Sequence, residues 1–148
     1  MLNNDRSRSA DGWQFPFEKL RVWQQARKLV KLVYDDTRQF PDTERYGLTS
    51  QLNRAATSVA CNLAEGVSRA SRKDQAHFSA LAYGSLMEVA CLLLVCQDNE
   101  FLHEERVVEL RQHVRDLSVG ICALRRAQLR GVEEVERAGR AVERAKSC

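Results

Sequence analysis

The sequence predicts an all-α protein, an antiparallel up-down-up-down four-helix bundle. Among its 148 residues the only prolines are Pro16 and Pro41, so no proline interrupts a helix after residue 41. Four segments repeat apolar residues at spacings of three and four, and none alternates as a strand would. The connectors between these segments are short, which makes consecutive helices antiparallel neighbours.

The first helix is predicted from Glu18 to Gln39. Its apolar stripe consists of Val22, Ala26, Leu29, Val33 and Thr37. Phe40-Pro41 ends the helix, because the residue before a proline is disfavoured in the α region. Residues 1–14 are polar and are expected to form a disordered arm ahead of the bundle domain, residues 15–130.

The second helix is predicted from Leu48 to Glu65. Its apolar face consists of Leu48, Leu52, Ala55, Val59 and Leu63. Gly66 follows directly and is predicted to be the left-handed residue that ends the helix.

The third helix is predicted from Arg72 to Gln97, with Ser71 as its N-cap and Asp74 near the positive end of the helix dipole. It is the most apolar of the four segments, so we expect it to be the most buried. The residues predicted to point inward are Phe78, Leu81, Ala82, Ser85, Leu86, Val89, Leu92, Leu93 and Cys96.

The fourth helix is predicted to start near His103, with a seam that alternates spacings of three and four as in coiled coils. The seam comprises Val107, Leu110, Val114, Leu117, Ile121 and Leu124, and continues as Gln128, Gly131, Val135, Ala138, Val142 and Ala145. Gln128 and Gly131 are poor seam residues, so packing is expected to end there. Residues 131–148 are predicted to be a frayed helical extension.

Charge and cysteine content point to a cytoplasmic protein. The net charge of +3 is too small to indicate a nucleic-acid partner by itself. The five cysteines form no C-x-x-C pair, which favours a reducing compartment over a disulfide scaffold. The N-terminus lacks the apolar stretch of a secretory signal, and the longest apolar run, from Val89 to Cys96, has eight residues. No membrane association is expected.

A basic stripe on the first helix is the best candidate for contacts with phosphates. It consists of Arg21, Lys28, Lys31 and Arg38, on the side opposite the apolar stripe. The alternative is an ordinary solvated face. Three aromatic residues precede this helix, Trp13, Phe15 and Phe17. They either staple the arm to the bundle or stack on the bases of a single-stranded nucleic acid.

The second helix also carries a polar arc of roughly 80° beside its apolar face, at about 100° per residue. The arc consists of Gln51, Arg54, Ser58, Asn62 and Glu65. Glu88 on the third helix is a candidate partner for Arg54, and Gly84-Ser85 is expected to allow close approach of a neighbouring backbone. The interpretations are a structural or inter-subunit hydrogen-bond network, a binding site, or a carboxylate pair of Glu65 with Glu88.

These residues carry a family resemblance over about residues 15–125. The motifs are Phe17-Glu18-Lys19-Leu20-Arg21-Val22-Trp23-Gln24, Glu44-Arg45-Tyr46-Gly47-Leu48-Thr49, Asn62-Leu63-Ala64-Glu65-Gly66, and Gly84-Ser85-Leu86-x-Glu88. In this order they resemble the four-helix-bundle family first noticed as open reading frames in intervening sequences of bacterial 23S ribosomal RNA genes.

The resemblance implies a homo-oligomer, since relatives are described as ring-like homopentamers. The related accessory variability determinant proteins of diversity-generating retroelements have basic surfaces and associate with a reverse transcriptase and nucleic acid. We therefore expect a non-enzymatic binding or scaffold protein that associates with RNA, DNA or a nucleic-acid enzyme. A purely structural oligomer without a nucleic-acid role is one alternative.

The second alternative is a metal-independent ribonuclease of the HEPN type, which carries an Arg-x4–6-His motif. Arg72 with His77, and Arg106 with His113, fit this spacing, although chance alone accounts for about one such match. No histidine lies at metal-ligand spacing with another histidine or a cysteine. The sequence therefore predicts no metal, no cofactor and no catalytic residues.

Overall fold

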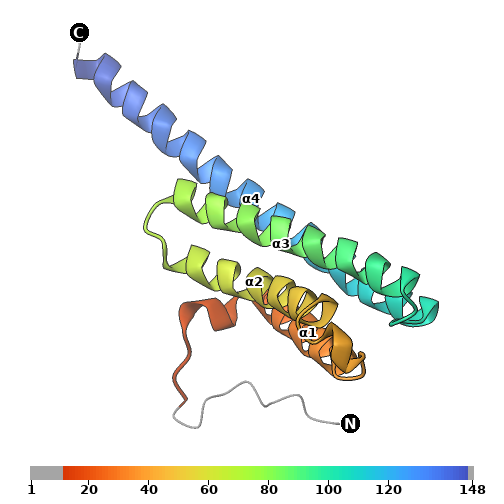
Figure 1. The fold of residues 1–148 in the computed structure, drawn as a ribbon. Helices are drawn as coiled ribbons and strands as arrows, with labels where there is room; N and C mark the ends of the chain where they lie inside the picture. Colours follow the sequence, from red (N-terminus) through yellow and green to blue (C-terminus); the bar gives the residue numbers. More distant parts are fainter. Residues whose placement is uncertain (1–11, 147–148) are drawn as a thin grey trace.

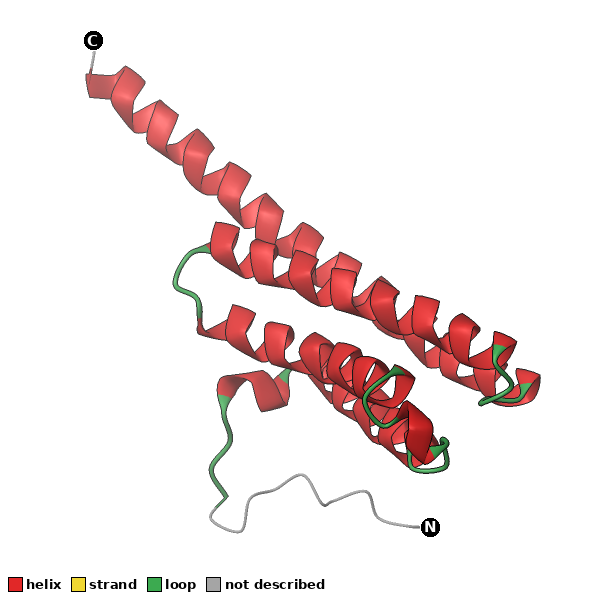
Figure 2. Cartoon of the chain, in the orientation of Figure 1, coloured by secondary structure: helices red, strands yellow, loops and turns green. Residues whose placement is uncertain are grey.

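The protein is an all-α four-helix bundle, as the sequence predicts (Figures 1 and 2). The computed structural model describes residues 12–146, with side chains to residue 144. The elements are the 3-10 turns η1 (Pro16–Lys19) and η2 (Asp42–Glu44) and the helices α1 (Arg21–Thr37), α2 (Leu48–Ser68), α3 (Arg72–Asp98) and α4 (Glu104–Lys146). Consecutive helices pack together, and α1 also packs against α4, which closes the bundle.

The first helix begins later than predicted. Pro16 opens the turn η1, in which the Phe15 backbone N–H donates to Glu18 Oε2 at 2.6 Å. Leu20 is extended, so α1 starts only at Arg21 and ends at Thr37 rather than at Gln39. The predicted disordered arm comprises residues 1–14. Of these, residues 1–11 lie outside the described residues, and residues 12–14 have no regular secondary structure.

The core is built from the predicted apolar stripes. The five stripe residues of α1 are buried, as are Leu52, Ala55, Val59 and Leu63 of α2. The α4 seam is buried from Val107 to Ile121. These faces meet along the bundle axis, where their removal from water supplies the main stabilisation of the fold.

Gly66 does not end the second helix, contrary to the prediction. It is buried inside α2, which continues to Ser68, and a Cβ at this position would come within 3.0 Å of Phe78 Cβ. The glycine therefore serves the close packing of α2 on α3. The close approach predicted at Gly84 is absent, because nothing lies within 4 Å of a Cβ placed there.

The predicted start of α3 at Arg72, capped by Ser71, is confirmed. The prediction of which α3 residues point inward is wrong in part. Ser71 Oγ accepts from the Asp74 backbone N–H at 3.0 Å, which caps the helix. Leu81, predicted to be inward, is 43% exposed, whereas Ser79 is buried.

The outer side of α3 is apolar as well. It exposes Tyr83, Met87, Cys91 and Leu94, and Glu88 is the only charged residue between Gln75 and Gln97. By length and hydropathy α3 matches a membrane-crossing helix, but a core helix of a soluble bundle meets the same test, so this match is weak evidence. α3 therefore has an apolar face on its outer side as well as its core side, and no residue of the described chain covers the outer one.

Packing along α4 ends at about Gly131, as the seam predicts, but Gln128 itself is packed. Gln128 is only 6% exposed, and its Oε1 accepts from Ser79 Oγ at 2.8 Å. A polar seam residue is thus accommodated by a polar partner on α3. Beyond Gly131 the helix continues to Lys146 and projects past the end of the other helices (Figure 1).

Candidate nucleic-acid interface

The basic stripe lies on the outer face of α1. Arg21, Lys28, Lys31 and Arg38 are all exposed, on the side opposite the buried residues of the helix. In the described part of the chain Arg21 and Lys28 take part in no ion pair. Their charges are therefore available to a ligand.

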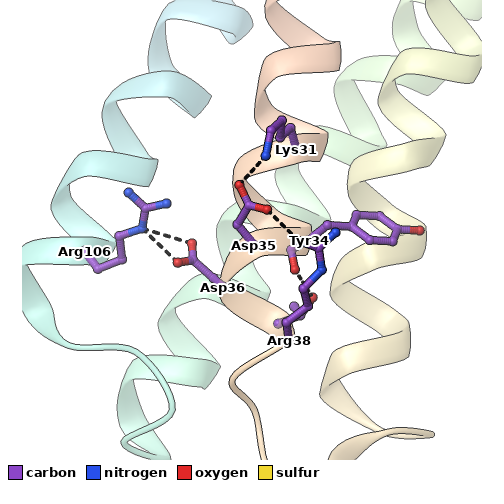
Figure 3. A network of polar contacts seen from close by, with 7 residues as sticks. Lys31, Tyr34, Asp35, Asp36, Arg38 and Arg106 are labelled. Carbon is purple, nitrogen blue, oxygen red and sulfur yellow. Dashed lines mark hydrogen bonds and ion pairs between the residues drawn. The ribbon is translucent and has the colours of Figure 1, made fainter.

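Asp35 lies within the stripe and was not anticipated from the sequence. Lys31 Nζ is 2.7 Å from Asp35 Oδ2, and Arg38 Nη1 is 3.0 Å from Asp35 Oδ1 (Figure 3). The hydrogen bond from Lys31 is the main cause that lowers the pKa of Asp35. The carboxylate orients the two cations and offsets part of their positive potential. The i,i+4 spacing of Lys31 and Asp35 was the available sequence signal.

Arg27 and a ladder of aromatic rings border the stripe. The Arg27 guanidinium carbon lies 5.7 Å from the centroid of the Trp23 ring. Three ring contacts lead outward from Trp23 to Phe17, Phe15 and Trp13, with centroid separations of 4.9, 5.4 and 4.3 Å. The ladder thus joins the segment before α1 to the bundle, which agrees with the staple interpretation. Because Phe15 and Trp13 are about half exposed, stacking on a base is also sterically open.

On another side of α1, Asp36 connects the helix to α4. Arg106 Nε donates to both carboxylate oxygens of Asp36 at 3.0 Å (Figure 3). Arg106 Nη1 donates to Glu109 at 2.6 Å. Burial opposes the charge of the guanidinium, but the bonds to Glu109 and Asp36 outweigh burial and raise the pKa of Arg106. No hydrogen bond among the described residues joins Arg106 to His113 or Arg72 to His77.

The polar arc of α2 is divided between two environments. Ser58 Oγ lies 2.8 Å from Ser85 Oγ of α3, and Asn62 Nδ2 donates to Ser58 O and Oγ at 2.9 and 3.1 Å. These three residues form a half-buried network between α2 and α3. Glu65 instead pairs with Arg69 at the exposed end of α2.

The remaining residues of the arc surround an open hollow of about 330 Å³. Its lining comprises Gln51, Arg54, Ala55, Ser58 and Glu88. The structure brings Arg54 and Glu88 to the same hollow, but no ion pair joins them among the described contacts. The predicted Arg54–Glu88 partnership is therefore not formed.

Glu65 and Glu88 do not form a carboxylate pair. The contacts Ser58–Ser85 and Gly66–Phe78 fix the antiparallel alignment of α2 and α3. Glu88 is level with Ala55, ten residues and roughly 15 Å along α2 from Glu65. Within residues 12–146 no group of three His, Cys, Asp or Glu side chains is close enough to hold a metal ion.

A second hollow lies between α3 and α4 and was missed from the sequence. It measures about 370 Å³ and is lined by Ala80, Tyr83, Ile121, Cys122, Arg125, Arg126 and Leu129. It adjoins the exposed apolar face of α3, so this face extends onto α4. Only the packing of two helices reveals such a surface, because its residues are 40 positions apart in the chain.

Comparison with known proteins agrees with this fold. The family model described as 23S rRNA-intervening sequence protein matches residues 18–122. A crystal structure of a protein of unknown function, from the S23 ribosomal protein family of Bacteroides thetaiotaomicron, aligns with a TM-score of 0.63 at 15% identity. The alignment covers 70% of this chain and 96% of that chain. No curated protein matches the sequence.

Proposed function

Because the chain belongs to the 23S rRNA-intervening sequence protein family, we propose that it is a non-enzymatic, self-associating binding protein whose basic α1 face contacts the phosphates of RNA or DNA. The observation that carries this proposal is the outward side of α1. Arg21, Lys28, Lys31 and Arg38 are exposed there, and Arg27 lies beside them. Asp35 is the only acidic residue among them, so a positive surplus remains.

The spacing of the stripe suits a nucleic-acid backbone. From Arg21 to Arg38 the helix rises roughly 25 Å, which is comparable to several consecutive phosphates of one strand. Contacts of this kind give affinity without sequence readout. The ring ladder at one end of the stripe offers stacking surfaces to single-stranded bases.

Self-association is supported by the outer face of α3. Tyr83, Met87, Cys91 and Leu94 follow one another at spacings of three and four and are all exposed. A continuous apolar helix face flanked by polar surface is typical of an interaction site. The homopentamer implied by the family resemblance would cover this face and would repeat the basic stripe around the ring. Repetition raises the local potential beyond that of one helix.

The proposal of a non-enzymatic protein rests on the contacts of Arg72 and Arg106, the two arginines that fit the Arg-x4–6-His spacing. Arg106 is held by Asp36 and Glu109, and Arg72 hydrogen-bonds Gln75 at 3.4 Å. Neither guanidinium is directed to a histidine by a hydrogen bond in the described chain. A catalytic arginine and histidine need a shared site within reach of one phosphate.

Charge reversal on α1 tests the binding role. In Lys28→Glu/Lys31→Glu we expect more than about tenfold weaker binding of a fluorescein-labelled single-stranded RNA, measured by anisotropy at fixed salt. The matched control is Arg111→Glu/Arg115→Glu, which makes the same charge change on exposed residues of α4. Equal losses in both variants would mean that net charge, and not the α1 face, governs binding.

The identity of the ligand is resolved by the same assay. Single-stranded RNA and DNA, and duplex DNA of the same length, are compared with the unmodified chain. If none binds, the partner is a protein, such as a reverse transcriptase or another nucleic-acid enzyme, or the chain is a purely structural oligomer.

A further inference from the structure

The hollow between α3 and α4 combines an apolar lining with two positive charges. Ile121, which is fully buried, contributes to the lining, and so do Tyr83 and Leu129, which are 37% and 38% exposed. The two charged residues of the lining are Arg125 and Arg126. Ligand sites in proteins are typically concave and mostly apolar, with a small number of polar groups that fix the ligand. The hollow therefore has the composition of a small-molecule site.

Small side chains in the lining leave room for a ligand. Ala80 of α3 contributes only a methyl group, and Cys122 of α4 contributes only a short thiol. On α4, Cys122, Arg126 and Leu129 follow one another at spacings of four and three, so they lie on one side of the helix. The volume of about 370 Å³ is that of about a dozen water-sized groups, at about 30 Å³ each. The hollow therefore suits a ligand of about that many heavy atoms.

The chain itself does not neutralise the two charges at the hollow. Arg125 and Arg126 are exposed, and neither takes part in an ion pair within the part of the chain that the structure describes. No carboxylate lines the hollow. Guanidinium groups bind carboxylates and phosphates through charge-assisted hydrogen bonds. The two arginines therefore favour an anionic group beside the apolar lining.

We propose that this hollow binds a small soluble amphipathic anion, that is, a carboxylate or phosphate attached to an apolar body. The apolar body contacts Tyr83, Ile121 and Leu129, and the anionic head group pairs with Arg125 and Arg126. An uncharged ligand would gain only apolar burial, and a bare anion would gain only exposed ion pairs, which are weak in water. No residue of α1 lines the hollow, so this inference is independent of the function proposed for α1.

Calorimetric titration of the full chain tests the two halves of the ligand. Octanoate and octyl phosphate carry both an apolar body and a charge, and the stronger binder of the two identifies the preferred head group. 1-Octanol lacks the charge and acetate lacks the apolar body, so each should bind about tenfold or more weakly than octanoate. The proposal is wrong if neither octanoate nor octyl phosphate binds, or if 1-octanol binds as tightly as octanoate.

Variants of the lining test where the ligand lies. Arg125→Gln/Arg126→Gln should weaken octanoate binding about tenfold or more. The matched control is Arg111→Gln/Arg115→Gln, which removes the same charge from exposed residues of α4 outside the lining and should leave the affinity nearly unchanged. Ala80→Phe fills the hollow without changing the charge and should also abolish binding, while circular dichroism checks that each variant stays helical. Equal losses in the arginine variant and its control would overturn the site, because net charge would then govern binding.

Cys122 reports directly whether the hollow is occupied. Its thiol is free and partly exposed, so iodoacetamide should alkylate it in the chain alone. Saturating octanoate should slow this reaction several-fold and leave the alkylation of the exposed Cys61 on α2 unchanged. Binding of octanoate without protection of Cys122 would place the ligand elsewhere and refute the proposal. The proposal is also wrong if Cys122 is already protected without ligand and light scattering gives more than one chain, because a second copy then covers the hollow.

Discussion

Arg106 Nε on α4 donates hydrogen bonds to both carboxylate oxygens of Asp36 on α1, each at 3.0 Å. The two side chains are 27% and 13% exposed, so this ion pair is the least hydrated of those in the described chain. It joins the first and last helices of the bundle, which no connector links directly. The adjacent residue Asp35 instead faces solvent and orients Lys31 and Arg38 of the basic stripe. Neighbouring aspartates thus serve the fold and the candidate interface separately.

Asp36→Asn is expected to lower the free energy of unfolding by about 1–2 kcal/mol, because it leaves a partly buried guanidinium without its charge partner on α1. Chemical denaturation measures the change. The matched control is Asp35→Asn, which removes an exposed carboxylate and should not change stability measurably. Similar losses in the two variants would contradict the structural role given to Asp36.

Gly120→Ala should destabilise the bundle by about 1–3 kcal/mol, because a Cβ there would come within 2.6 Å of Val22 Cγ1 across the α1–α4 contact. Gly84→Ala is the control, since open space surrounds that position. An alanine in the helix interior should stabilise it by about 0.5–1 kcal/mol. The melting temperature should therefore fall for Gly120→Ala and rise for Gly84→Ala. A higher melting temperature for Gly120→Ala would show that α1 and α4 are not closely packed at Gly120.

The buried hydrogen bond between Ser79 and Gln128 predicts coupling between α3 and α4. Gln128→Leu should cost about 1–2 kcal/mol, because the Ser79 hydroxyl loses its partner in a buried site. The double variant Ser79→Ala/Gln128→Leu should lose less than the sum of the two single variants. Additive losses would indicate that the two side chains do not interact.

The cysteines are expected to differ in reactivity. Burial, with a smaller effect of the Glu44 charge, raises the pKa of Cys96 from 9.0 to about 11, whereas Cys61 and Cys91 are exposed. Iodoacetamide at pH 8 should therefore modify Cys61 and Cys91 first and Cys96 only after unfolding, as peptide mapping would reveal. Modification of Cys96 at the rate of Cys61 would contradict its burial.

The same shift has a consequence for stability. Because the folded pKa is raised, the Cys96 thiol favours the folded state fully below pH 9 and loses this contribution as the pH rises toward 11.

Helical periodicity was sufficient to predict the four helices and most of the core. The apolar stripe residues between Val22 and Thr37, and the seam residues between Val107 and Ile121, are buried as their spacing predicts. Local rules also predict the Ser71 cap, because its partner is three residues away. These features depend on residues within one or two helical turns.

The features that the sequence did not predict depend on contacts between residues far apart in the chain. A glycine after an apolar run signals either a helix end or a close contact, and for Gly66 only the position of Phe78 distinguishes them. The burial of Gln128 could not be predicted either, because its partner Ser79 is 49 positions away. The Arg106–Asp36 pair spans 70 positions, so periodicity carried no sign of it.

The candidate interface was only partly accessible from the sequence. The exposure of the basic stripe follows from its angular position opposite the core. The neutralising Asp35, the neighbouring Arg27 and the ring ladder require side-chain geometry. The hollow between α3 and α4 could not be predicted, because it depends on how two apolar helices are set against each other.

The most direct test of the central claim is the salt dependence of nucleic-acid binding. Each phosphate contact contributes about 0.7–0.9 to the slope of log affinity against log salt concentration. If α1 binds the backbone, Lys28→Gln/Lys31→Gln should reduce the slope for single-stranded RNA by about 1–2 relative to the unmodified chain. An unchanged slope would mean that these lysines contact no phosphates and that the function proposed for α1 is wrong.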